Sequence, residues 1–174
     1  MPQQRYQQDL TRPEFRHDDA QANAVRHLQR VCDELTARYD ASRTASGLGR
    51  LSVKKNQRRP VQGLYMWGGV GRGKTYLMDL FFEALPFRRK MRIHFHRFMQ
   101  RVHKELNALR GTQNPLDIVA DTLRKEAVVI CFDEFFVTDI TDAMLLGGLF
   151  EKLFARGVTL VATSNIVPDR LYEN

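Results

Sequence analysis

The sequence has no long hydrophobic run and only two cysteines, and these absences exclude several classes of protein. No apolar stretch approaches the roughly 20 residues that a membrane-spanning helix needs. Residues 1–20 are polar and include four acids, so they lack the features of a secretory signal and of a mitochondrial presequence. Cys32 and Cys131 lie far apart, which favours buried free thiols in a reducing compartment. We therefore expect a protein of the bacterial cytoplasm.

Acidic residues are missing from two stretches that carry most of the net charge of +7. Residues 41–60 contain six Arg or Lys and show no apolar periodicity, so we interpret them as a flexible basic linker. Residues 86–104 contain seven Arg or Lys and three of the five histidines. The positive charge is therefore concentrated in patches, which leaves an anionic partner open.

What the chain does contain is an alternation of apolar strands with amphipathic helices. Apolar segments predict strands at about 61–67, 91–98, 127–135 and 158–165. Helical spacing predicts helices at 18–40, from 74 to 85, from the end of the second strand to 109, at 115–125 and between Thr141, its expected cap, and Gly157. This alternation indicates an α/β fold, with a parallel sheet covered by helices on both faces. We expect a helical segment at 1–40, the linker at 41–60 and one α/β core at 61–174.

Residues 68–75, Gly-Gly-Val-Gly-Arg-Gly-Lys-Thr, lie between the first predicted strand and the next helix. They match the G-x-x-x-x-G-K-[S/T] pattern of a phosphate-binding loop, and a plain glycine-rich turn is the alternative. Glycines let backbone N–H groups surround a triphosphate, and the start of the next helix adds further donors. Lys74 would lie between the β- and γ-phosphates of ATP, and the Thr75 hydroxyl would ligate Mg²⁺. We assign nucleotide binding to Gly68, Gly69, Val70, Gly71, Arg72, Gly73, Lys74, Thr75 and Tyr76.

Three polar residues follow predicted strands, where ligands of parallel sheets bind. Asp133 ends one strand and would hold Mg²⁺, and Glu134 would orient and deprotonate a water molecule. The alternative is an acidic pair that only solubilises the strand end. Asn165 lies at the carboxyl end of the last strand and would bind the attacking water or a γ-phosphate oxygen, although an Asn also suits a turn before Pro168. We assign Glu134, Asn165 and Lys74 to catalysis.

Three histidines raise the question of a metal or nucleic-acid site. His94 and His96 would share one face of the second strand, and His103 would lie on the following helix. No Cys or carboxylate has a matching spacing, so a transition-metal site is not the favoured interpretation. The segment HFHRF alternates aromatic and cationic residues that could stack on a nucleic acid, but Phe95 and Phe98 are more simply core residues.

The motif-bearing segments resemble the ZapE family of AAA+ ATPases, which includes bacterial cell-division ATPases and mitochondrial relatives. They are GLYMWGGVGRGKTYLMDLFFEALP, HFHRFMQRVHKEL, CFDEFFVTDITDAMLLGGLF and LFARGVTLVATSN. The resemblance covers about residues 15–174 and implies a P-loop NTPase fold of AAA+ type with Mg²⁺-dependent ATP hydrolysis. It also implies FtsZ or another cell-division or protein-quality-control protein as partner, a homo-oligomer, and association with the inner membrane.

The resemblance implies a Walker A loop at 68–75, a Walker B pair at Asp133 and Glu134, and a sensor-1 residue at Asn165. We expect the helical lid, its sensor-2 arginine and the arginine finger beyond Asn174, and we assign the finger to neither Arg72 nor Arg156. Gln21 could reach adenine or be a solvated helix position.

The leading interpretation is an ATPase that remodels a protein partner. One alternative is a nucleic-acid-associated ATPase of helicase-loader type, which would use the two basic stretches. Another is a nucleotide-binding module without turnover.

Overall fold

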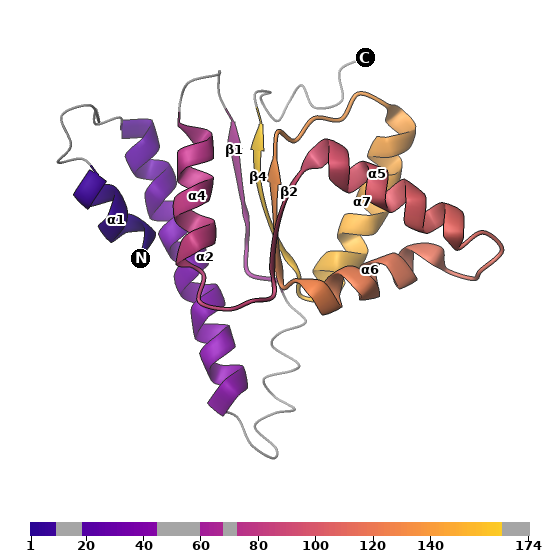
Figure 1. The fold of residues 1–174 in the computed structure, drawn as a ribbon, viewed down its shortest axis with the longest axis horizontal. Helices are drawn as coiled ribbons and strands as arrows, with labels where there is room; N and C mark the ends of the chain where they lie inside the picture. Colours follow the sequence, from indigo (N-terminus) through magenta and orange to yellow (C-terminus); the bar gives the residue numbers. More distant parts are fainter. Residues whose placement is uncertain (10–18, 45–59, 68–72, 165–174) are drawn as a thin grey trace.

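Four parallel strands form one sheet in the computed structural model, which describes residues 1–9, 19–44, 60–67 and 73–164 (Figure 1). The strands are β1 (Leu64–Trp67), β2 (Lys90–His94), β3 (Val129–Asp133) and β4 (Thr159–Ser164). Their order across the sheet is β1-β4-β3-β2, so the last strand in sequence lies between the first and the third. The parallel sheet predicted from the alternation of elements is confirmed.

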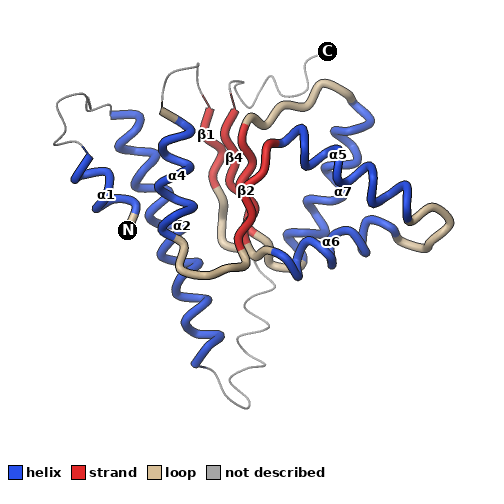
Figure 2. The backbone as a smooth tube through the Cα atoms, in the orientation of Figure 1, coloured by secondary structure: helices blue, strands red, loops and turns tan. Residues whose placement is uncertain are grey.

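Helices cover both faces of this sheet and make a three-layer sandwich (Figure 2). One face carries α1 (Pro2–Asp9), α2 (Asp19–Thr44) and α4 (Lys74–Ala84). The other carries α5 (Phe95–Ala108), α6 (Pro115–Glu126) and α7 (Ile140–Ala155). Each face has its own apolar core, and strand side chains alternate between the two. No helix among the described residues is long and apolar enough to cross a membrane.

The register of the strands brings their carboxyl ends to one edge of the sheet, called here the carboxyl edge. His94 is the partner of Asp133, and Trp67 is the partner of Ser164. Phe132 pairs with Ala162, which places the end of β3 beside the end of β4. The carboxyl ends of β1, β3 and β4 therefore lie at the same edge, as the prediction for the ligand site requires.

The second strand is shorter than predicted, because α5 begins at Phe95 rather than after Phe98. Phe95, Phe98, Met99 and Val102 are buried and are spaced as one face of a helix. The alternation in MRIHFHRF therefore ends at His94. The prediction that His94 and His96 share one face of a strand is wrong, since His96 lies on α5.

The N-terminal part also differs from the prediction in its details. Helix α1 lies within the helical segment expected at 1–40 but before the helix predicted at 18–40, and its Tyr6 is buried in the core formed by α2 and α4. Helix α2 continues to Thr44, past the predicted boundary at residue 40, and the rest of the basic stretch, 45–59, lies outside the described residues. The cap of α7 is Asp139, whose carboxylate accepts from the Thr141 N–H at 2.7 Å, so the prediction of Thr141 as the cap is wrong.

The two cysteines are free and buried, as predicted. Cys32 of α2 packs in the apolar core on the same face of the sheet as α1 and α4, and Cys131 lies in the centre of β3. Burial raises the pKa of the Cys131 thiol to about 12, which keeps it protonated and unreactive at neutral pH.

Candidate active site

The start of α4 supplies the first part of the candidate site. Gly73 has φ of 71°, a left-handed conformation that glycine adopts without strain, and its carbonyl accepts from Leu77 N–H at 3.0 Å. Lys74 and Thr75 are the first two residues of α4, where backbone N–H groups have no partner inside the helix. The first turn contains no acid, so the positive end of the helix dipole remains available to an anion. Residues 68–72 of the predicted loop lie outside the described residues.

The second part is Asp133, the last residue of β3. Arg92 of β2 binds both of its carboxylate oxygens, with Nε 2.8 Å from Oδ2 and Nη2 3.2 Å from Oδ1. The side chain of Asp133 is only 14% exposed, so this two-pronged contact holds it in one orientation.

Arg92 also donates to Asp79 of α4 and therefore bridges two carboxylates. Burial by itself would lower the pKa of Arg92, but hydrogen bonds and charges from Asp133 and Asp79 outweigh it and raise the pKa. The guanidinium thus stays charged at every physiological pH.

This bridge connects the two sequence motifs. Asp79 lies four residues after Thr75 on α4, so the two side chains are neighbours on one face of the helix. The contact of Arg92 with Asp79 therefore turns the face that carries Thr75 toward the end of β3, where Asp133 lies. Sequence reasoning missed both Arg92 and Asp79, because it treated the first only as part of a basic stretch. An arginine on a predicted strand and an acid one turn after Thr75 were the available signals.

Glu134 lies at a sharp change of chain direction directly after β3. Its φ of 57° is left-handed, and its N–H donates to Thr163 Oγ1 at 3.3 Å. The next N–H, of Phe135, donates to the Thr163 carbonyl at 2.7 Å, and Ser164 Oγ donates to the Phe135 carbonyl at 2.7 Å. These contacts with β4 hold the Glu134 backbone in a conformation that is sterically unfavourable for residues other than glycine.

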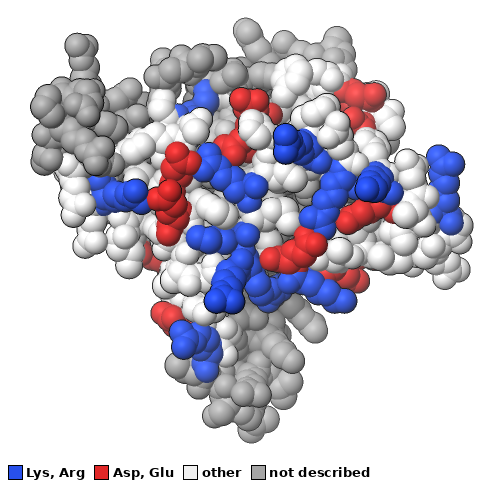
Figure 3. All heavy atoms as spheres, viewed as in Figure 1, with Lys and Arg blue, Asp and Glu red and all other residues white. Residues whose placement is uncertain are grey.

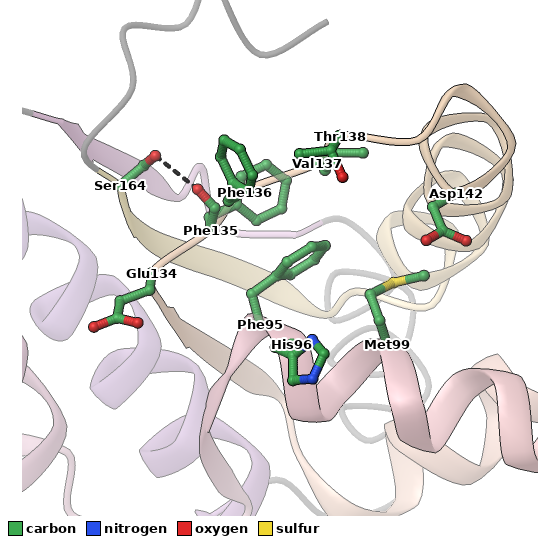
Figure 4. Close-up of a pocket in the computed structure, with 10 residues that line it drawn as sticks. All are labelled: Phe95, His96, Met99, Glu134, Phe135, Phe136, Val137, Thr138, Asp142 and Ser164. Carbon is green, nitrogen blue, oxygen red and sulfur yellow. Dashed lines mark hydrogen bonds between the residues drawn. The ribbon is translucent and has the colours of Figure 1, made fainter.

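The side chain of Glu134 is the exposed member of the acidic pair, with 75% of its surface accessible. Figure 4 shows its carboxylate pointing away from the phenyl rings of Phe95, Phe135 and Phe136. The imidazole of His94 lies close to it, with Nδ1 3.6 Å from Oε2. Asp133 and Glu134 are therefore adjacent in sequence but differ in environment: one is held by a guanidinium, and the other is accessible to water.

A cavity of about 600 Å³ opens beside Glu134. It is lined by Phe95, His96, Met99, Glu134, Phe135, Phe136, Val137, Thr138, Asp142 and Ser164 (Figure 4). His103 Nε2 contacts Asp142 Oδ1 at 2.9 Å on the α5 side of this cavity. Its lining combines aromatic side chains from α5 and the segment after β3 with polar groups from Glu134 and from α5, α7 and β4.

The predicted residues are only partly brought together. Asp133 and Glu134 lie at the end of β3, and Ser164, the residue before Asn165, lies beside them. Asn165 and the side chain of Gln21 lie outside what is described. Arg156 follows α7 at the other end of the sheet and pairs with Asp117 and Asp121.

The donor set at this edge suits Mg²⁺. A carboxylate offers about four lone-pair sites, so Asp133 can accept from Arg92 and still bind a cation or its water. Mg²⁺ typically binds one or two carboxylates and keeps several waters. The described residues contain no group of three or more His, Cys, Asp or Glu placed to hold a metal by themselves.

Comparison with known proteins matches all 174 residues to one family. The family model is described as AFG1-like ATPase and spans residues 1–174. The cell division protein ZapE of Escherichia coli strain K12 is 55% identical over 179 residues, which cover 99% of this chain and 48% of that protein. Lactation elevated protein 1 homolog B of Danio rerio is 47% identical over 126 residues, covering 66% of this chain and 25% of that protein. The chain thus spans about half the length of the Escherichia coli relative.

The fold is also similar to a solved domain of a replication protein. Domain III of the Thermotoga maritima replication initiation protein DnaA superposes with a TM-score of 0.53 and 24% identity, over 79% of this chain and 53% of that one. At this identity the likeness extends to the fold alone. The α/β fold of AAA+ type expected from the sequence is confirmed.

Proposed function

The chain belongs to the AFG1-like ATPase family, and from this premise we propose that it binds and hydrolyses Mg·ATP at the carboxyl edge of its sheet. The supporting observation is the bridge from Asp133 through Arg92 to Asp79. It joins the end of β3 to the helix that begins with Lys74 and Thr75. A P-loop ATPase needs these two elements side by side, because one binds the phosphates and the other the metal.

Each proposed role follows from the chemistry of the side chain and its position. Lys74 places its ammonium group between the β- and γ-phosphates, and residues 68–73 and Tyr76 supply backbone contacts. The Thr75 hydroxyl and the Asp133 carboxylate hold the metal. Bound Mg²⁺ neutralises negative charge on the β- and γ-phosphate oxygens. Asn165 donates a hydrogen bond to the attacking water or to the γ-phosphate.

Glu134 is the proposed general base. It is the accessible member of the acidic pair, and its backbone is fixed by Thr163 while its side chain can still reorient. Its carboxylate orients a water molecule and takes the proton as the water attacks the γ-phosphorus. Asp133 is assigned to the metal instead, because Arg92 holds its carboxylate in one orientation and only 14% of the side chain is exposed.

At the cellular level, we propose that this chain acts in cell division on a protein partner such as FtsZ, or on a partner in protein quality control. The proposal extends the name of the Escherichia coli relative to this chain. Phe136, in the segment before α7, and Ile140 and Met144, in its first turns, are exposed apolar residues next to the site, which favours a protein partner. We place the protein in the cytoplasm, peripheral to the inner membrane and able to form a homo-oligomer.

A nucleic-acid-associated ATPase is the second proposal, and it rests on exposed cations of α5. Arg97 and Lys104 are exposed, but Arg101 between them contacts Glu105 at 3.2 Å and Glu126 at 2.7 Å. One of the three cations in the row is therefore neutralised by the protein itself. This favours the protein partner over nucleic acid.

Measurements of steady-state ATP turnover test these proposals. The chain is assayed with and without FtsZ, and with and without single-stranded DNA. Stimulation by FtsZ alone supports the protein partner. Stimulation by DNA that weakens steeply with salt supports the second proposal, because phosphate contacts release counterions. Binding of ATP with no turnover under any condition would leave a nucleotide-binding module and contradict the hydrolysis.

A further inference from the structure

A second cavity, of about 530 Å³, lies at the end of the sheet opposite to the candidate active site. It is bounded by the C-terminal half of α2, by the loop before β2, and by the C-terminal ends of α6 and α7. Arg89 and Val128 line it directly before β2 and β3 begin, so this is the amino edge of the sheet. Lys and Arg side chains gather over the lower part of the molecule in Figure 3, where these elements meet.

Four arginines line this cavity, namely Arg38, Arg88, Arg89 and Arg124, and the last two are held in place by backbone carbonyls. Arg89 donates from Nε to the Lys125 carbonyl at 3.2 Å and from Nη2 to the Arg124 carbonyl. Arg124 donates from Nε to the Arg156 carbonyl at 2.9 Å. These acceptors lie at the C-terminal ends of α6 and α7, so both guanidiniums cap helix ends. Arg88 lies exposed at the rim.

Helix capping does not account for all of the donors or for the charge. Nη1 of Arg124 is buried and has no hydrogen-bond partner among the described residues. Within the described part of the chain, Arg88, Arg89 and Arg124 make no ion pair with an acid. A helix end carries only about half an elementary negative charge, and so balances part of a guanidinium.

The net charge of the groups around this cavity is therefore positive. Burial, followed by the nearby charge of Arg89, lowers the pKa of Arg124. A pKa shifted in this direction means that the environment disfavours the charged guanidinium. An anion in the cavity would satisfy the buried Nη1 donor and relieve the repulsion between the two arginines.

The cavity also has an aromatic wall beside these cations. The rings of Tyr39 and Phe87 lie 5.4 Å apart, and both residues line the cavity. The volume lies within the roughly 300–1,000 Å³ of typical small-molecule sites. A guanidinium fork matches phosphate oxygens better than a single point charge does.

We propose that this cavity is a binding site for a small soluble phosphorylated ligand, separate from the nucleotide site. Arg124, the least exposed of the three, and Arg89 bind the phosphoryl oxygens, and Arg88 adds a contact from the rim. The apolar or planar part of the ligand lies against Tyr39 and Phe87. We call this the arginine site, formed by Arg88, Arg89 and Arg124.

The experiment uses inorganic pyrophosphate as the probe and the Lys74→Ala chain as background, so that binding at the phosphate-binding loop is weakened. Isothermal titration should show one saturable site in this background. Adding Arg88→Glu should weaken binding roughly 10- to 100-fold, the loss typical of a charged hydrogen bond. Arg110→Glu, at the end of α5, makes the same change of charge away from the cavity and should leave the affinity within about twofold.

Arg88 is the main test because it makes no capping contact within the described residues, so its substitution should not alter folding. Arg124→Met should also abolish binding, with circular dichroism used to confirm the fold. Absence of saturable binding, or equal affinity of the Arg88→Glu and Arg110→Glu chains, would overturn the proposal. Another outcome is that the chain floats with phosphatidylglycerol vesicles, loses this with Arg88→Glu, and does not bind pyrophosphate. That result would assign the arginines to a lipid headgroup and would also overturn the proposal of a soluble ligand.

Discussion

Arg92 and Arg124 are partly buried arginines at opposite edges of the same sheet, and they differ in what surrounds them. Arg92 is bound by two carboxylates, from Asp133 and Asp79, so its charge is balanced inside the protein. Arg124 is bound through Nε by a carbonyl, lies near Arg89, and keeps a buried donor unpartnered. The protein uses the first guanidinium to orient an acid, whereas the second needs an anion from outside.

This difference separates a positioning residue from a binding residue. At the carboxyl edge, the ligand groups are held by a balanced network before any nucleotide arrives, which lowers the cost of ordering them on binding. At the amino edge, the cations are held by helix ends while their charge remains partly unbalanced. Substitutions at the two edges should therefore affect stability and binding in different proportions.

The largest expected effect concerns the accessible acid at the carboxyl edge. Glu134→Gln keeps the size of the side chain but removes the base, so turnover should fall roughly 10²- to 10⁴-fold while ATP affinity changes little. Single-turnover assays and equilibrium binding of ATP measure the two quantities. Glu151→Gln, an exposed position on α7, is the matched control. Turnover at the wild-type rate in the Glu134→Gln chain would rule out Glu134 as the base.

Lys74→Ala should weaken ATP binding by about 10- to 100-fold, since it removes one charged contact to the phosphates. Lys104→Ala, which removes an exposed cation on α5, should leave the affinity unchanged. Titration calorimetry with ATP and Mg²⁺ compares the two chains. Equal affinities would contradict the assignment of residues 68–75 as a phosphate-binding loop.

The contrast between the two arginines can be tested directly by equilibrium unfolding. Arg92→Met should lower the free energy of unfolding by about 2 kcal/mol. Breaking a fully buried ion pair costs roughly 3–5 kcal/mol, and the cost is lower here because Asp79 is half exposed. Arg124→Met loses one hydrogen bond but also removes an unsatisfied buried charge, so its cost should stay below about 1 kcal/mol. Urea titrations give both values. Equal costs would mean that Arg124 is balanced as fully as Arg92.

The smallest expected effect is at the start of α7, beside the first cavity. Asp139→Ala removes the side chain that caps the helix and should cost about 1 kcal/mol of stability. Thr141→Ala should cost a few tenths of a kcal/mol at most, because only the backbone of Thr141 takes part in the cap. Thermal unfolding of the two variants compares them. A larger loss for Thr141→Ala would restore the cap expected from the sequence.

The sequence predicts elements well where periodicity is unambiguous. Leu146, Leu149 and Leu153 lie on the buried face of α7, as their spacing indicates. Prediction fails at Phe95–Phe98, where alternating apolar residues fit both a strand and the first turn of a helix. Packing of Phe95 and Phe98 against Phe132 favours the helix, and Phe132 lies more than 30 residues further along the chain.

The parts of this protein that depend on short segments could be read from the sequence. They include the parallel α/β class, the motif at 68–75 and the location of Asp133 and Glu134 at a strand end. Each follows from the local spacing of residues, because glycine-rich loops and apolar periods constrain only their own neighbourhood.

The two arginine environments required the tertiary structure. Arg92 meets Asp133 because β2 lies next to β3, and it meets Asp79 because α4 packs against the neighbouring strands on the same face of the sheet. Arg89 and Arg124 are 35 residues apart in sequence. They meet because the C-terminal end of α6 lies beside the start of β2 at the amino edge. Whether an arginine is neutralised inside the protein or remains open to an anion depends on side chains from distant segments, and such contacts leave no periodic signal in the sequence.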